Sequence, residues 1–226
     1  MQKIKDLLLE NQDLEYKTFH QKLMPTIENE RVIGVRIPKI KEIVKRVKDS
    51  PFSLDFIKEK HYYYEENNVH GGLLEYLPKT KEELFLMIEE FLPYIDNWAT
   101  CDFTVSNLKR VKKLKKEFFE RIKVWIKSDK PYTVRFAIVL LLTYYKEELT
   151  EEIYKLVNSV KLEDYYVNMG VAWFYSVALV YDYERVKEIL ESKILKPFIQ
   201  NKSISKGIDS FRLTKEQKEY LKTLKK

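Results

Sequence analysis

Four polar residues recur in this chain at a fixed spacing that would place them on one shared face. They are separated by 33 positions each and comprise Asp102, Arg135, Asn168 and Asn201. A spacing of 33 residues fits one pair of antiparallel helices, and a stack of such pairs brings equivalent positions side by side. The spacing therefore predicts a groove lined by a carboxylate, a guanidinium and two amides.

Two tryptophans lie close to this register and would supply aromatic walls. Trp98 precedes Asp102 by one helical turn, so their side chains share a helix face, and Trp173 follows Asn168 by five residues. The functional interpretation is an acid that a guanidinium keeps ionised, in a cleft with aromatic walls. The alternative is structural: Asp102 and Arg135 form an ion pair between two helices, and the tryptophans belong to the core.

The elements that must position these residues are predicted to be helices. Hydrophobic residues make up 45% of the 226 positions, and five glycines and seven prolines are too few for a loop-rich or all-β fold. Apolar residues at helical spacing predict helices over residues 38–47, 52–60, 62–77, 84–92 and 105–125. Residues 197–212 are less regular, and residues 215–226 indicate a final basic helix or a frayed tail.

Two further segments are apolar on nearly every side, which predicts buried helices. They span residues 134–145 and 165–181. Arg135 is the exception in the first of them, and a buried arginine needs a groove or a carboxylate partner. The predicted N-caps are Thr80, Asp96, Ser128 or Asp129, and Asp164.

The net charge of +6 is unevenly distributed. Residues 103–130 hold ten Lys and Arg against three acids, and residues 187–226 hold eleven against five, whereas the rest of the chain is net acidic. Two basic zones of this kind suit a polyanion such as nucleic acid, although a solvated helix face has the same composition. The candidate DNA-binding residues in these zones are Lys109, Lys112, Lys113, Lys116, Lys202, Lys206 and Arg212, together with Asn168 and Asn201.

Composition also restricts the other classes of function. The single cysteine, Cys101, forms no disulfide within the chain and suits a reducing compartment, so a cytoplasmic protein is expected. The opening stretch of residues 1–13 is amphipathic and contains acids, unlike a signal peptide, and no apolar run is long enough to span a membrane. We expect one elongated domain over residues 1–226.

Few other groups could do chemistry. His61, Glu66 and His70 could share a helix face, but zinc sites show tighter clustering of His and Cys, so no metal and no cofactor are predicted. Cys101 points to a different helix face from Asp102, which makes a thiolate nucleophile a poor candidate. The chain contains neither a phosphate-binding glycine loop nor a nucleophile elbow.

Several segments resemble the DNA alkylation repair family, the AlkD-type alkylpurine DNA glycosylases built from HEAT-like repeats. They are DNWATCDF (96–103), PYTVRFAIVLLL (131–142), YYVNMGVAWFYSVAL (165–179), GVRIPKI (34–40) and PFIQNKSISKGIDSFR (197–212). The resemblance implies an all-α superhelix (α-solenoid) with a concave basic groove. One departure is Asn97, which stands where well-studied members have a second tryptophan.

The resemblance also implies an activity. The family's cleft of two tryptophans, an aspartate and an arginine carries over to Trp98, Trp173, Asp102 and Arg135. The expected reaction is hydrolysis of the N-glycosidic bond of N3- or N7-alkylated purines in double-stranded DNA, by a monomer that does not flip the base. Some relatives only bind unusual DNA, so a non-catalytic binder of distorted or branched DNA is the alternative. A second alternative is a helical-repeat scaffold that binds another protein.

Overall fold

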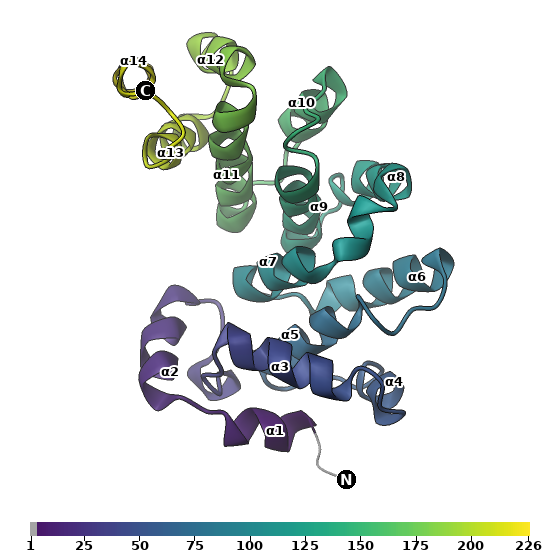
Figure 1. Ribbon diagram of the computed structural model, residues 1–226. Helices are drawn as coiled ribbons and strands as arrows, with labels where there is room; N and C mark the ends of the chain where they lie inside the picture. The colour runs from purple at the N-terminus through teal and green to yellow at the C-terminus, as the bar shows by residue number, and fades with distance from the viewer. Residues whose placement is uncertain (1–3) are drawn as a thin grey trace. The chain divides into compact units, whose positions relative to one another are not determined.

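The computed structural model describes residues 4–226 as an all-α protein (Figure 1). Within that part of the chain there are fourteen α-helices, four short 3-10 segments and no strand, which confirms the predicted fold class. The α-helices are α1 (Ile4–Glu10), α2 (Leu14–His20), α3 (Ile37–Val47), α4 (Phe52–Phe56), α5 (Tyr64–Leu73), α6 (Lys81–Phe91), α7 (Trp98–Asn107), α8 (Lys115–Trp125), α9 (Pro131–Tyr144), α10 (Glu151–Asn158), α11 (Tyr165–Tyr181), α12 (Tyr183–Glu191), α13 (Pro197–Ile208) and α14 (Lys215–Thr223). The 3-10 segments are η1 (Gln21–Leu23), η2 (Asn29–Arg31), η3 (Leu92–Tyr94) and η4 (Lys109–Lys112).

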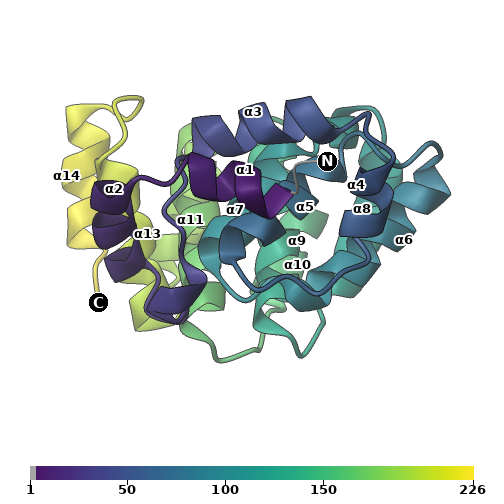
Figure 2. The ribbon, with the colours of Figure 1, turned by 90° about the horizontal axis from the view of Figure 1, so that it is seen from below.

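The chain divides into two compact units, Met1–Lys113 and Leu114–Lys226. In the first unit α3 packs on α5 and α5 packs on α7, and Figure 2 shows α1 alongside α3. In the second unit α9 packs on α11, α11 packs on α13, and α8, α12 and α14 each pack on one of these three helices. Stacking of successive helices within each unit is consistent with an α-solenoid. One domain over residues 1–226 stays a prediction.

The 33-residue spacing corresponds to one helix pair. Asp102, Arg135 and Asn201 are each the fifth residue of their helices, α7, α9 and α13, and Asn168 is the fourth residue of α11. One further helix (α8, α10 or α12) separates each member of this series from the next. The register read from the sequence therefore identifies equivalent or adjacent positions on alternate helices.

In the first unit, α5 is tightly enclosed by the helices on either side of it. A Cβ atom at Gly71 would lie 2.0 Å from the Thr104 Oγ1 of α7, and one at Gly72 would lie 2.7 Å from the Val44 Cγ2 of α3. Only glycine permits this approach. Gly71 therefore fixes how closely α7, which carries Trp98 and Asp102, packs on α5, and Gly72 fixes how closely α3 packs there.

In the second unit the predicted burial of the two apolar helices is confirmed. Every residue of α9 from Thr133 to Leu142 is buried, Arg135 included, and α11 is buried along most of its length. Neither helix can cross a bilayer, and the same holds for every other helix of residues 4–226. The amphipathic opening stretch forms α1 from Ile4 onward, and residues 1–3 lie outside the described part of the chain.

Several predicted helix boundaries are wrong. The segments expected over 52–60 and 62–77 are shorter, as α4 and α5, and the basic region over 105–125 is interrupted. There, Asn107 Nδ2 donates to the Phe103 carbonyl at 2.7 Å, and Leu108 leaves the helical conformation with φ −76° and ψ 67°. Residues 197–208 form the regular helix α13, whose close packing on α11 is made possible by Gly207, since a Cβ there would lie 2.6 Å from Leu179.

The predicted caps are partly confirmed. The Thr80 hydroxyl accepts from the Glu83 amide at 3.1 Å, and the Asp164 carboxylate accepts from the Tyr166 and Val167 amides at 2.7 and 3.0 Å. Ahead of α9, neither Ser128 nor Asp129 is the cap. The helix begins directly at a proline, which has no amide hydrogen that needs a cap.

The cap of α7 is Asn97 and not Asp96. The Asn97 Oδ1 accepts from the Thr100 amide at 2.8 Å, whereas Asp96 forms an ion pair with Arg31 at 2.7 Å. Either residue type is a good N-cap. Because Arg31, distant in sequence, pairs with the Asp96 carboxylate, the side chain that caps α7 is that of Asn97.

Candidate functional site

Trp98 and Asp102 lie on the first two turns of α7, and a buried polar network holds the start of that helix in place. Asn97 is fully buried, and its amide also donates to Asp96 Oδ1 at 2.9 Å. The Thr100 hydroxyl donates to Asn68 Oδ1 of α5 at 2.7 Å. The N-terminus of α7 is thus joined by hydrogen bonds both to its own cap and to the neighbouring helix.

The Trp98 ring is half-buried and held by two kinds of contact. Its indole N–H donates to the Leu23 carbonyl at 2.9 Å, and its edge meets the ring of His20 with centroids 6.1 Å apart. His20 in turn stacks on Tyr16 at 4.9 Å, and burial lowers the pKa of this histidine. Trp98 is therefore neither a fully buried core residue nor a free surface side chain, and its ring plane is fixed.

Asp102 follows one turn later and is half-buried. Its neighbour Cys101 is fully buried, so the two side chains occupy different faces of α7, as predicted. A half-buried carboxylate on a rigid helix has the accessibility that contact with an external ligand requires.

In the second unit, Arg135 is buried at 6% exposure and reaches from α9 to α11. Its Nη1 donates to the Tyr166 carbonyl at 2.8 Å. Gly170 lies beside it, where a Cβ atom would come within 3.8 Å of the same Nη1. The predicted need of a buried arginine for a polar partner is met here in part by a backbone oxygen.

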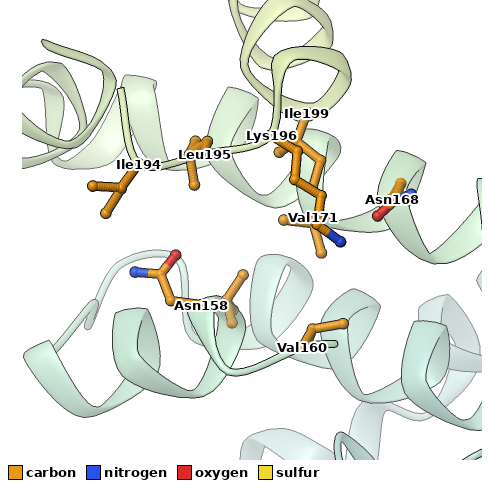
Figure 3. Close-up of a pocket in the computed structure, with 9 residues that line it drawn as sticks. Asn158, Val160, Asn168, Val171, Ile194, Leu195, Lys196 and Ile199 are labelled. Atoms are coloured by element: carbon orange, nitrogen blue, oxygen red, sulfur yellow. The ribbon is translucent and has the colours of Figure 1, made fainter. Parts of the chain in front are cut away.

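Asn168 and Trp173 lie on α11, and both are half-buried. Figure 3 shows Asn168 beside Lys196 at a cavity of about 230 Å³, formed by α10, α11 and the segment that enters α13. Lys196 pairs with Glu163, and both Lys196 and Asn168 lower the pKa of that carboxyl. Asn168 therefore belongs to a small charged cluster at the rim of this cavity.

The predicted DNA-binding cations are all exposed. They are Lys109, Lys112 and Lys113 in the first unit and Lys116, Lys202, Lys206 and Arg212 in the second. None of them forms an ion pair with a carboxylate of residues 4–226, whereas Lys115 pairs with Glu148 and Lys123 pairs with Glu152. These seven side chains are available to phosphates, and their role stays a prediction.

Asn201 has a different environment from the other members of the register. Its amide oxygen accepts from the Lys226 amide at 2.9 Å, and its Nδ2 donates to the Lys226 carbonyl at 2.9 Å. It holds the segment after α14 against α13.

The histidines considered for a metal site form a buried pair. His61 Nε2 and His70 Nδ1 lie 3.2 Å apart, and burial lowers their pKa values to about 4 and about 3. Glu66 does not complete a site, since its carboxylate accepts from the Tyr62 and Tyr63 amides ahead of α5. Residues 4–226 contain no group of three side chains placed to hold a metal ion.

Sequence reasoning missed the residues that support the site. Asn97 precedes Thr100 by three positions, which is the spacing of an N-cap and its amide partner, so this signal was available. The Tyr166 carbonyl, which accepts from Arg135, carries no comparable signal, because it is a backbone group.

Two comparisons with known proteins bear on the function of this chain. No curated protein matches the chain. A family model described as DNA alkylation repair enzyme matches residues 4–206, a range that contains every candidate residue except Arg212. The chain therefore belongs to the DNA alkylation repair enzyme family.

Proposed function

We propose that the protein is a DNA glycosylase that hydrolyses the N-glycosidic bond of N3- or N7-alkylated purines in duplex DNA, the first step of base excision repair. The observation that carries this proposal is the family match over residues 4–206, because that range contains all four candidate catalytic residues. The local geometry supports it, since Trp98 and Asp102 lie on a rigid helix and Arg135 and Trp173 on two helices packed together.

Asp102 has the central chemical role in this proposal. An alkylated purine is already cationic, so the bond between its ring nitrogen and C1′ breaks with both electrons leaving on the base and without a general acid. The sugar then develops positive charge, which a fixed carboxylate stabilises. Water adds to C1′ and loses its proton, which leaves an abasic sugar and the free base.

The remaining residues hold the substrate. The faces of Trp98 and Trp173 attract the cationic nucleotide, as aromatic faces attract other cations. Arg135 binds a backbone phosphate beside the lesion, and the exposed cations together with Asn168 and Asn201 contact the flanking backbone. The lesion stays in the duplex, so no deep base pocket is required.

Water is the only co-reactant in this scheme. The proposed reaction uses no metal ion and no organic cofactor. We propose that the protein acts as a monomer in the cytoplasm. Membranes have no part in the reaction.

The test is base release by the purified protein. Duplex DNA treated with a methylating agent is incubated with the protein, and chromatography measures free 7-methylguanine and 3-methyladenine. Release above the rate with heat-inactivated protein is expected. If the protein binds duplex or branched DNA but releases no base, it is a non-catalytic DNA binder, which the seven exposed cations would equally allow.

A further inference from the structure

The turn between α13 and α14 presents one aromatic side chain entirely to solvent. Phe211 is 101% exposed, whereas Leu14, the next most exposed large apolar residue among residues 4–226, is 67% exposed. Single exposed apolar residues are common on proteins. A phenylalanine with no covering contact at all is unusual enough to require an explanation.

This exposure does not come from a loose loop, since both sides of Phe211 are anchored. The Ser210 amide donates to the Gly207 carbonyl at 3.0 Å, and the Arg212 amide donates to Ser210 Oγ at 3.2 Å. Leu213 is buried at 6% exposure, directly after the turn. The backbone is therefore held in a shape that keeps the Phe211 ring away from the protein.

The residue that follows Phe211 is a cation, Arg212, which contacts the ring of Tyr181 on α11. The Arg212 guanidinium lies 4.4 Å from the centre of the Tyr181 ring, and the Lys146 ammonium lies 5.5 Å from the same centre. Neither forms an ion pair with a carboxylate of residues 4–226. Residues 202–218 hold five cations against two acids, one of which, Asp209, is in the turn itself. Basic residues therefore predominate in the segment that carries Phe211.

We propose that Phe211 is a stacking contact for duplex DNA, which enters a base step from a groove while Arg212 and Lys206 bind the flanking phosphates. DNA fits both observations, because it offers phosphates outside and flat apolar surfaces between its bases. Proteins that bend DNA insert single apolar side chains in this way and partly unstack the step. This inference rests on the proposed function, which supplies duplex DNA as the partner. It assigns Phe211 a role in binding DNA, before the N-glycosidic bond is broken.

The test uses an undamaged duplex that contains 2-aminopurine, whose fluorescence rises when it is unstacked. Wild-type protein should raise this emission on binding. Phe211→Ala should abolish the rise and weaken binding about tenfold, in line with measured base–aromatic stacking. Phe211→Trp, which keeps a flat ring, should retain both signals. Phe19→Ala is the matched control, because Phe19 on α2 is also an exposed phenylalanine, at 61% exposure.

The outcomes separate this inference from the proposed function. If wild-type protein binds duplex DNA and releases alkylated bases while Phe211→Ala binds and unstacks equally well, the stacking role is wrong and the glycosylase proposal stands. If wild-type protein binds no DNA, with or without lesions, both are wrong. Binding to phosphatidylserine vesicles that depends on Phe211, with DNA binding independent of it, would assign the ring to a membrane surface instead. Melting temperatures equal to wild type confirm that the variants are folded.

Discussion

The two units of the protein hold their candidate residues in different ways. Among residues 4–113 of the first unit, eleven polar or charged residues are buried, including Asn68, Asn97 and Thr100 around the start of α7, whereas the second unit has five. There, Arg135 is buried among the apolar residues of α9 and donates to the Tyr166 carbonyl of α11. Hydrogen bonds are directional, so the stability of a buried network depends on each of its members. Apolar packing tolerates substitution by other apolar side chains of similar volume. The two units should therefore respond differently to substitution and to pH.

The largest expected effect concerns Asp102. Asp102→Asn keeps the shape of the side chain and removes its charge, so base release should fall by about two orders of magnitude or more. The melting temperature should stay close to that of wild type. Release from methylated duplex and a circular dichroism melt measure the two quantities. If the variant turns over like wild type, Asp102 is not the catalytic carboxylate, and if it unfolds, the residue has a structural role.

The next effect is a loss of stability in acid, located in the first unit. His61 and His70 have pKa values of about 4 and about 3 in the folded protein, because burial disfavours their charged forms, against 6.5 for the ordinary side chain. The unfolded chain therefore binds more protons below pH 6.5, and stability is lost as the pH falls from 6.5 towards 4. Each unit of pKa difference corresponds to about 1.4 kcal/mol, so a loss of about 2 kcal/mol or more is expected.

Urea unfolding at a series of pH values measures this loss. The matched variant is His61→Phe with His70→Leu, whose free energy of unfolding should change less over the same range. Burial raises the pKa of Glu65, so this residue acts in the opposite sense and is present in both proteins. An equally steep loss in the double variant would assign the acid sensitivity to other groups.

The tryptophans allow a comparison of the units by activity. Trp98→Ala and Trp173→Ala should each slow lesion processing about tenfold and leave binding to undamaged duplex nearly unchanged, because the rings contact the cationic nucleotide. Trp98→Ala also removes the hydrogen bond to Leu23, so only this variant should lower the melting temperature of the first unit. Equal losses of lesion processing and undamaged binding, with large drops in melting temperature for both, would make them core residues.

The smallest effect concerns helix caps. Asn97→Ala removes the buried cap of α7 and should cost about 1 kcal/mol or more of stability. Thr150→Ala removes the exposed cap of α10, whose hydrogen bond to the Ile153 amide is long at 3.4 Å, and should cost less. Chemical denaturation of the two variants measures the difference. Equal losses would show that burial of the network around Asn97 adds nothing to the cap.

The helices and the register were predictable because both depend on local spacing. Ile40, Ile43, Val44 and Val47 are buried as their periodicity indicates, and the 33-residue step identifies equivalent positions on α7, α9 and α13. The choice between Asp96 and Asn97 as the cap was not predictable, since it depends on Arg31, 65 residues earlier. The interruption after Asn107 was missed for a different reason. The apolar stripe continues past the break, at which the Asn107 side chain donates to the Phe103 carbonyl.

The close packing at Gly71 has a consequence for genetics. A methyl group there would collide with Thr104 on α7, the helix that also carries Asp102, although Gly71 itself lies on α5 and belongs to no proposed contact with DNA. A screen for alleles that lose repair should therefore recover substitutions at this glycine beside those at the carboxylate. Growth temperature should distinguish the two classes of allele. Substitutions at Gly71 should regain repair activity in the cold, where a destabilised fold is tolerated, whereas substitutions at Asp102 should lack activity at every temperature.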